Sequence, residues 1–189
     1  MSPTENDAGA PAGRAAAPKL DEEQFGSLFQ ACAADLHGYV ISLLGDRAAA
    51  QDITSLAFER LYRSRARLDS RRGSARAWLF AIARNAALDE LRRRRRERAV
   101  LSTEEPAEAL SAVDLLVDAE RRATVRAALR SLPLRDREIV LLKFHGQLSN
   151  AELARAMGIS ESNAGTRLHR ALTRLRENCA GAAPEREVA

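Results

Sequence analysis

Apolar residues recur every three or four positions along most of the chain, which is the spacing of a helix that buries one face. In the N-terminal half this spacing predicts four helices, which we expect to begin near Phe25, Ala48, Ser74 and Leu88. Ser74 is placed to cap the third helix. The chain contains neither the alternation typical of strands nor a repeat of fixed period. These patterns predict an all-α protein.

A polar stretch in the middle divides the chain in two. Residues 99–120 contain six acidic residues and no basic residue, and Pro106 interrupts any helix there. We therefore expect an acidic, flexible linker joining two small helical domains, with the stretch VDLLVDAERR (113–122) either part of this linker or already helical. The predicted boundaries are a disordered tail at 1–20, a four-helix domain at 21–98, the linker at 99–121, a second helical domain at 122–178 and a tail at 179–189.

The stretch LSNAELARAMGISESNAGTRLHRALTRLR (148–176) predicts a helix-turn-helix. Ser149 and Glu152 have the spacing of a capping box at the start of the first helix. Gly158 can end that helix with a positive φ, and Ser160 can cap the next helix. A plain helical hairpin with a solvated basic face is the alternative interpretation.

One face of the second of these helices is polar and basic. It comprises Ser162, Asn163, Thr166, Arg167, Arg170 and Arg174. Side chains of these types reach base edges and phosphates in a major groove. This face favours DNA binding, although the motif alone does not distinguish a repressor from any other DNA-binding protein.

Charge and composition support anion binding by both halves of the chain. Residues 60–98 contain 14 arginines and four acidic residues, a net charge of +10, and residues 121–176 have a net charge of +8. Two basic blocks on either side of an acidic connector predict two anion-binding modules. Aromatic residues make up only 4% of the chain, so the core must consist mainly of aliphatic side chains.

Five consecutive arginines follow Leu91, and at about 100° per residue they cannot share one face of a helix. We expect Arg95 to continue the buried stripe, and Arg94 either to lie in solvent or to reach a distant phosphate. The remaining three, Arg92, Arg93 and Arg96, are predicted to face a nucleic-acid backbone together with Asp89.

No pattern in the chain predicts an enzyme, a cofactor or a metal site. Cys32 and Cys179 are far apart and form no CxxC pair, which is typical of a reducing compartment, and each is expected to be a buried or incidental thiol. The chain has neither an apolar run long enough to span a bilayer nor the apolar centre of a secretory signal. We therefore expect a cytoplasmic protein that is not inserted in a membrane.

The order of these parts resembles the extracytoplasmic-function (ECF) group of bacterial RNA polymerase sigma factors, within the sigma-70 family. The helix AAAQDITSLAFERLY (48–62) is similar to the family's helix for binding core polymerase. The stretches at 71–96 and 129–176 are similar to its minus-ten and minus-thirty-five modules. The resemblance covers roughly residues 21–178 and implies sigma region 2 at 21–98 and sigma region 4 at 122–178. It implies that the protein directs core polymerase to specific promoters.

In this family the polymerase-binding helix docks on the clamp helices of the largest polymerase subunit. The resemblance assigns this role to Asp52, Ser55, Leu56, Phe58, Glu59 and Arg63. Ser55 stands where the family usually has glutamine, and Leu56 where an acidic residue is usual. Leu56 is either an apolar residue on a partner-binding face or part of the core.

The resemblance also assigns promoter-binding residues. Asn85 aligns with the loop residue that captures a flipped-out minus-ten base, although a helix cap is the alternative, and Trp78 is expected in the core rather than as a melting wedge. The minus-ten set is Arg84, Asn85, Asp89, Arg92, Arg93 and Arg96. The minus-thirty-five set adds His169 to the polar face above. His169 has no second metal ligand at a suitable spacing, and Gly165 stands where Lys or Arg is usual.

The resemblance implies contacts with the clamp helices and flap of core polymerase, with promoter DNA and with an anti-sigma factor, and association with the bacterial nucleoid in the holoenzyme. A helix-turn-helix operator-binding regulator that is not a polymerase subunit is the main alternative. An arginine-rich RNA-binding module is less favoured, because RNA-binding modules that recognise single strands usually supply stacking aromatics.

Overall fold

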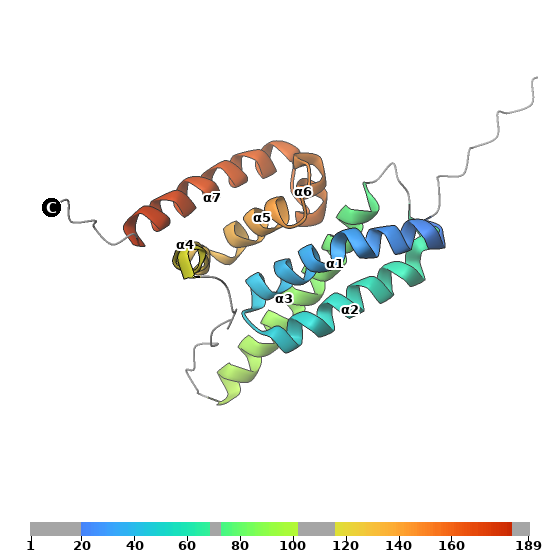
Figure 1. The fold of residues 1–189 in the computed structure, drawn as a ribbon, viewed down its shortest axis with the longest axis horizontal. Coiled ribbons are helices and arrows are strands. Elements are labelled where there is room, and N and C mark those ends of the chain that lie inside the picture. Colours follow the sequence, from blue (N-terminus) through green and yellow to red (C-terminus); the bar gives the residue numbers. More distant parts are fainter. Residues whose placement is uncertain (1–19, 69–72, 102–115, 183–189) are drawn as a thin grey trace, which may run out of the picture.

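The computed structural model describes residues 20–68, 73–101 and 116–182, and these residues fold into helices joined by short turns (Figure 1). No strand occurs in these ranges, so the all-α prediction is confirmed. The elements are α1 (Glu22–Leu44), α2 (Arg47–Ser64), the 3₁₀ turn η1 (Arg65–Arg67), α3 (Ala75–Leu101), α4 (Leu116–Ser131), α5 (Leu134–Phe144), α6 (Asn150–Met157) and α7 (Glu161–Ala182).

Helices α1, α2 and α3 pack on one another and form the N-terminal module (Figure 1). Gly45 ends α1 with φ 71°, a left-handed conformation that costs a glycine little. Asp46 then caps α2 by accepting a hydrogen bond from the backbone N–H of Ala49 at 3.0 Å. This Gly-Asp pair therefore reverses the chain and starts the next helix within two residues.

The predicted break between the third and fourth helices is wrong, because α3 is a single helix from Ala75 to Leu101. No Gly or Pro interrupts this stretch, and its apolar stripe continues unbroken from Leu79 to Leu91. Ser74 caps the helix as expected, since its Oγ accepts a hydrogen bond from the N–H of Ala77 at 3.1 Å. The N-terminal module thus has three α-helices and one 3₁₀ turn in its described residues.

Helices α4 to α7 form the C-terminal module, in which α6 and α7 are the predicted helix-turn-helix. The capping box of Ser149 and Glu152 is present at the start of α6. Gly158 ends α6 with φ 68°, and Ser160 accepts a hydrogen bond from the N–H of Asn163 at 3.2 Å. Each local signal in this motif is confirmed.

The helices extend beyond the predicted domain boundaries. Helix α3 continues to Leu101 and α4 begins at Leu116, so both enter the predicted linker at 99–121, and α7 continues past 178 to Ala182. The rest of that linker, at 102–115, lies outside the described residues, as do the predicted tails at 1–19 and 183–189.

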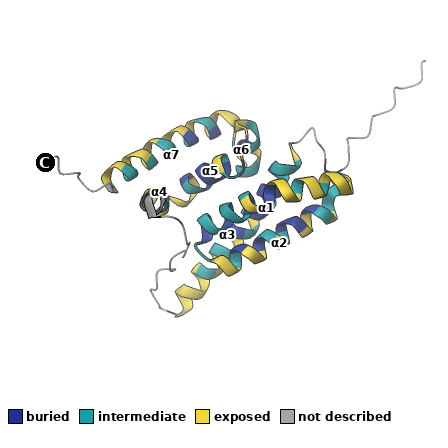
Figure 2. Cartoon of the chain, in the orientation of Figure 1, coloured by how far each residue is buried: buried dark blue, intermediate teal, exposed yellow. Residues whose placement is uncertain are grey.

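The two modules pack directly against each other and share one core. Helix α3 contacts α6, and α1 contacts α5. Buried side chains of both modules meet in a continuous cluster, which Figure 2 shows as dark blue on the facing sides of the helices. Its largest fully buried members include Tyr39, Phe80, Ile139, Leu142 and Leu148.

Candidate nucleic-acid interface

The second helix of the helix-turn-helix, α7, presents its predicted polar face away from the core. Leu168 and Ala171 are buried beneath it, so the remaining face is directed outward. Arg167 is half-buried, and the other members are exposed: Ser162, Asn163, Thr166, His169, Arg170 and Arg174. The structure therefore brings together the residues that the sequence assigned to minus-thirty-five recognition.

Arg174 differs from the rest of this face because it has a partner in its own module. Its guanidinium donates to the carboxylate of Asp136 on α5. Asp136 is largely buried, so the arginine covers a carboxylate that would otherwise be buried without a partner. Arg174 therefore stabilises the packing of α7 on α5.

The residues assigned to minus-ten recognition lie along α3. Asn85 is exposed in the middle of this helix, so the expected loop position and the helix-cap alternative are both wrong, while its role in base capture stays a prediction. One turn later, Asp89 accepts a hydrogen bond from Arg92 at 2.8 Å. The exposed side of α3 thus carries an amide followed by an ion pair.

The arginine run is divided differently from the prediction. Arg94 is the half-buried member, with 18% of its side chain exposed, and its guanidinium donates to Asp46 at 2.7 Å and to Glu90 at 2.6 Å. Arg95 is exposed, so it does not cover the core edge. The two roles are exchanged because Arg94 lies opposite the start of α2, where Asp46 pairs with it, and Glu90, four residues earlier on α3, pairs with it as well.

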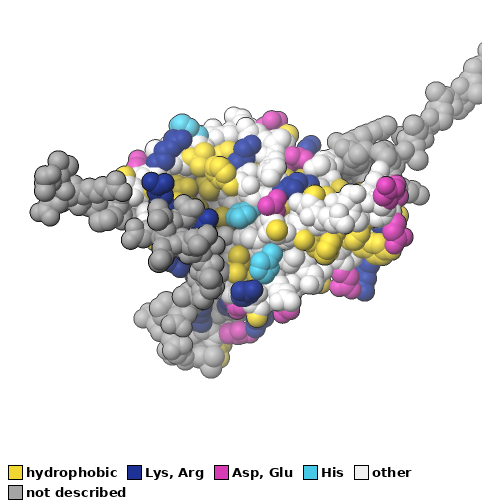
Figure 3. All heavy atoms as spheres, in the orientation of Figure 1, with side chains coloured by type: hydrophobic (Ala, Val, Ile, Leu, Met, Phe, Trp, Pro, Cys, Tyr) yellow, Lys and Arg dark blue, Asp and Glu magenta, His cyan; other side chains and the backbone are white. Residues whose placement is uncertain are grey.

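The exposed arginines at this end of α3 are partly neutralised by their own helix. Arg93 donates to Glu90 at 2.7 Å and to Glu97 at 2.5 Å. Hydrogen bonds from Arg93, and then from Arg94, hold the pKa of Glu90 at about 2. Figure 3 accordingly shows Lys and Arg side chains scattered over the visible face, with Asp and Glu among them, rather than one continuous basic patch.

Arg84 occupies a different environment from the other minus-ten candidates. Its Nη2 lies 3.0 Å from Oε2 of Glu138 on α5, and only 14% and 2% of the two side chains are exposed. Its Nη1 also donates to the carbonyl of Ala156 at 3.3 Å. Arg84 therefore lies in the contact between the two modules and not on the surface.

The polymerase-binding candidates lie on α2. Asp52, Ser55, Glu59 and Arg63 are exposed, Leu56 is half-exposed, and Glu59 pairs with Arg63 at 2.6 Å. Phe58 is buried and packs against Phe29 of α1, with ring centroids 4.7 Å apart.

An aromatic ledge, formed by Phe25, Phe29, Phe58 and Tyr62, lies where α1 and α2 meet. Phe29 is the exposed member, with 48% of its surface accessible. Figure 3 shows hydrophobic side chains in a band over this end of α1 and α2. Apolar surface next to the exposed row on α2 is the composition expected of a protein-binding face.

Family comparisons agree with this arrangement. Residues 28–97 match the family described as Sigma-70 region 2, and residues 122–175 match Sigma-70, region 4. The chain is 32% identical over 158 residues to the ECF RNA polymerase sigma factor SigL of Mycobacterium tuberculosis (strain ATCC 25618 / H37Rv). The match covers 79% of this chain and 85% of SigL. The chain belongs to the ECF sigma factors.

One further ECF sigma factor and two solved structures show similar likeness. SigK of Mycobacterium bovis (strain BCG / Pasteur 1173P2) is 27% identical over 164 residues, which is 84% of this chain and 87% of SigK. The sigma factor RpoE, solved in complex with the anti-sigma factor NepR from Bartonella quintana, superposes with a TM-score of 0.70 at 21% identity, covering 85% of this chain and 99% of RpoE. CnrH, solved in complex with the cytosolic domain of CnrY, superposes with a TM-score of 0.63 at 23% identity, covering 86% of this chain and 92% of CnrH. These structures share the fold.

Sequence reasoning missed the residues that join region 2 to region 4. Arg76 on α3 donates to the carbonyls of Gly146 at 2.7 Å and His145 at 2.8 Å. In the opposite direction, Glu138 and Glu152 of region 4 accept hydrogen bonds from Arg84 and Ser74 of region 2. No local motif marks such residues, since each is an ordinary charged residue at a helix end or on a helix face. Their spacing along the chain gives no signal, because their partners are about 40 to 80 residues away.

The described residues include two free cysteines, Cys32 and Cys179. Cys32 is buried, and burial raises the pKa of its thiol although Arg76 donates to its Sγ at 3.2 Å. Within the described ranges, no three His, Cys, Asp or Glu side chains form a group that could hold a metal ion. No helix in those ranges is long and apolar enough to cross a membrane.

Proposed function

We propose that this ECF sigma factor binds core RNA polymerase through α2 and directs it to promoters through α3 and α7. The observation that carries the proposal is the outward face of α7, on which every member of the polar set except the half-buried Arg167 is exposed. This face, on the second helix of a helix-turn-helix, has the composition that recognises a major groove. The protein acts by binding, without catalytic residues of its own.

Helix α2 is proposed as the polymerase-binding element. Asp52, Ser55 and Glu59 form an exposed row, with Leu56 beside it, and Phe58 fixes the helix on the core from beneath. Polar residues around a partly exposed leucine are typical of an interface that forms and dissolves. The clamp helices of the largest polymerase subunit are the proposed partner.

Helix α3 is proposed as the minus-ten element. Asn85 supplies an amide that can both donate to and accept from a base edge, while Arg92, Arg93 and Arg96 bind the backbone. The ion pairs of Arg92 and Arg93 do not prevent this, because exposed ion pairs are weak and a phosphate can replace the carboxylate.

An anti-sigma protein is the proposed regulator. RpoE was solved with the anti-sigma factor NepR, and CnrH with the cytosolic domain of CnrY. This chain shares their fold across more than four-fifths of its length. We propose that a comparable partner engages regions 2 and 4 of this protein together.

Transcription with purified core polymerase and a library of bacterial genomic fragments tests the function. We expect discrete start sites that require this protein, and their loss with Asp52→Arg. The matched control is Glu23→Arg, which makes the same charge change at an exposed position on α1. Specific binding of a dimer to duplex DNA, without start sites when polymerase is added, would instead establish the operator-binding regulator.

A further inference from the structure

Three charged side chains cross between region 2 and region 4 and hold the two regions together. Arg76 reaches from α3 to the two carbonyls at the end of α5, and its Nη2 also lies 2.5 Å from Asp35 of α1. Arg84 binds Glu138, and Glu152 of α6 accepts a hydrogen bond from Ser74 Oγ at 2.6 Å. The contact between the regions is therefore specific as well as apolar.

The Arg84–Glu138 pair is the most deeply buried of these contacts, and it is incompletely satisfied. The Nε of Arg84 and the hydroxyl of Tyr39 are both buried without a hydrogen-bond partner among the described residues. Burying an ion pair removes hydration that its attraction only partly replaces, and each unpaired polar atom adds to that cost. The pair therefore fixes how the regions dock more than it stabilises the docked state.

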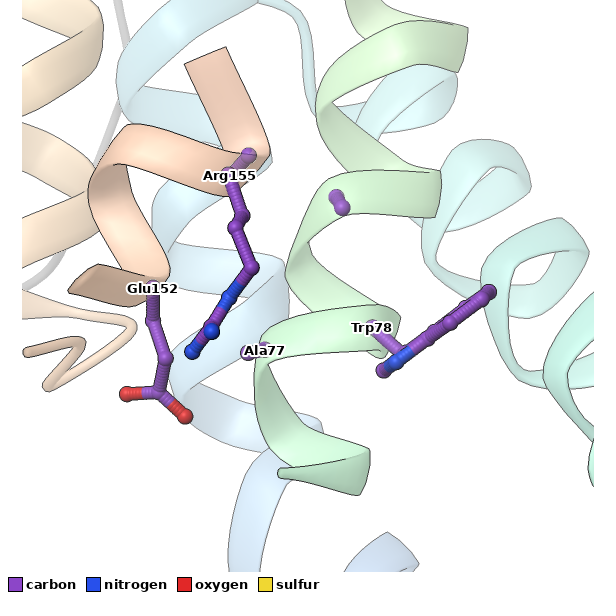
Figure 4. Close-up of a pocket in the computed structure, with 6 residues that line it drawn as sticks. Ala77, Trp78, Glu152 and Arg155 are labelled. Atoms are coloured by element: carbon purple, nitrogen blue, oxygen red, sulfur yellow. The ribbon is translucent and has the colours of Figure 1, made fainter. Parts of the chain in front are cut away.

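Packing at the edge of this contact is also incomplete. A hollow of about 280 Å³ lies between α3 and α6, lined by Ala77, Trp78 and Ala81 on one side and Glu152, Arg155 and Ala156 on the other. Figure 4 shows Glu152 and Arg155 on α6 facing α3, with the Trp78 ring extending from α3 away from α6. The unfilled space and the unpaired polar atoms lower the cost of separating the regions, which is set mainly by the apolar core that they share.

The docked arrangement covers Arg84, a side chain that the proposed function assigns to promoter binding. Both Nη atoms of Arg84 are engaged by region 4, one by Glu138 and the other by the carbonyl of Ala156. A phosphate therefore cannot bind Arg84 until region 4 moves away. The carboxylate of Glu138 already supplies an anionic partner to this guanidinium.

We propose that the contact between regions 2 and 4 is an intramolecular latch that keeps the free protein closed and withholds Arg84 from DNA. The second part rests on the proposed promoter function of α3. In the closed protein, the carboxylate of Glu138 is the anion that binds Arg84, and polymerase or DNA must displace it. Free protein is then in a state of reduced DNA affinity, without any inhibitor bound.

A glycine on α1 offers a variant that opens the latch without harming either region. A Cβ added at Gly38 would meet the imidazole of His145 at 3.0 Å, so a longer side chain must push the His145 ring away from α1 and should disfavour docking. Gly38→Gln should raise the helix propensity of α1, because Gly is the poorer helix former by about 1 kcal/mol. Gly26→Gln is the matched control, since nothing lies within 4 Å of a Cβ at that position of the same helix.

Distance measurement between spin labels tests closure directly in the full chain. The labels are placed at two exposed positions, Arg47→Cys on α2 and Glu177→Cys on α7. Cys179→Ser removes the partly exposed native thiol, and the buried Cys32 is retained. We expect one narrow distance distribution for the otherwise unchanged chain and for Gly26→Gln, and a longer, broader one for Gly38→Gln. Glu138→Gln should shift it in the same direction, and circular dichroism verifies that each variant is folded.

DNA affinity tests the second part of the proposal. The probe is a short fluorescein-labelled single-stranded oligonucleotide of mixed sequence, followed by anisotropy at fixed salt. Gly38→Gln should bind about threefold or more tightly than Gly26→Gln, because apparent affinity rises with the open fraction. Adding Arg84→Ala should remove most of that gain.

The outcomes separate the latch from the proposed function. Narrow distributions in both Gly38→Gln and Glu138→Gln, or a broad one in the unchanged chain, would overturn the latch. A gain in affinity that survives Arg84→Ala would overturn the role of Arg84 in it. Loss of polymerase-dependent start sites, with closure still observed, would instead remove the proposed function and leave the closed state established.

Discussion

The carboxylate of Glu152 accepts hydrogen bonds from Ser149, at the start of its own helix, and from Ser74, at the start of a helix in the other module. Burial alone would raise its pKa, but the hydrogen bonds from Ser74 and Ser149 outweigh burial and hold the pKa at about 2. One side chain thus completes the N-terminal capping of α6 and joins it to α3. Glu152 stays ionised throughout the physiological pH range.

Ser74→Ala should therefore cost more stability than the loss of an ordinary cap. Removing a serine cap costs typically about 1 kcal/mol, and this change also removes a hydrogen bond to Glu152. Ser160→Ala, which removes only the cap of α7, is the control. Urea unfolding of the full chain measures both. Equal losses would show that the link to Glu152 contributes nothing, and an NMR titration should show the pKa of Glu152 rising in Ser74→Ala.

Acidification should open the contact between the regions. The ring of His145 packs against Gly38, and burial lowers its pKa from the ordinary value of 6.5, although the carboxylate of Asp35 on α1 opposes this. Arg76 of α3 donates to the backbone carbonyl of His145 and not to its ring. Because the docked state favours the neutral ring, the docked state is fully stabilised above pH 6.5 and loses stability as the pH falls below that value.

The spin-label distances described above measure this effect between about pH 7.5 and about pH 5.5, a range that spans histidine titration. The distribution should broaden and lengthen on acidification, and the change should disappear in His145→Gln. Glu152 remains ionised over this range because its pKa is about 2. A pH response that is the same in His145→Gln would assign the effect to another group.

Local structure could be predicted from the sequence wherever the signal lies within a few residues. The capping box at Ser149, the left-handed Gly158 and the caps at Ser74 and Ser160 are all present as expected. These features depend on backbone groups three or four positions away, so their spacing is visible in the chain. The outward face of α7 follows in the same way from the 3.6-residue period.

Long-range pairing could not be predicted in this way. Arg84 was assigned to DNA from its neighbours on α3, but Glu138, 54 residues later, holds it in the contact between the regions. The roles of Arg94 and Arg95 were exchanged for the same reason, since the partner Asp46 is 48 residues earlier. An arginine that binds phosphate and one that binds a distant carboxylate have the same local pattern.

Gly165→Ala should stabilise the protein. Gly165 lies inside α7, and a Cβ there would meet only Asn150 Nδ2 at 3.7 Å, an ordinary contact. The expected gain is up to about 1 kcal/mol, from the better helix propensity of Ala. Gly158→Ala is the contrasting control, because its φ of 68° should make the same substitution cost roughly 1–2 kcal/mol. Thermal or urea unfolding that fails to show opposite signs would contradict the assigned backbone conformations.

The arginine run should separate into structural and DNA-binding members. Arg94→Ala removes the hydrogen bonds that join α3 to Asp46, the cap of α2, and to Glu90. It should lower the free energy of unfolding by about 1–2 kcal/mol. Arg96 is exposed, so Arg96→Ala should change the free energy of unfolding by no more than about 0.5 kcal/mol.

DNA binding should rank the same two variants in the opposite order. Measured in the Gly38→Gln background, Arg96→Ala should weaken oligonucleotide binding and reduce the slope of log K against log salt by about 1, as expected for one lost phosphate contact. Arg94→Ala should leave that slope unchanged while the protein remains folded. If Arg94→Ala lowers the slope and Arg96→Ala does not, the carboxylates of Asp46 and Glu90 are not the partners that keep Arg94 from DNA.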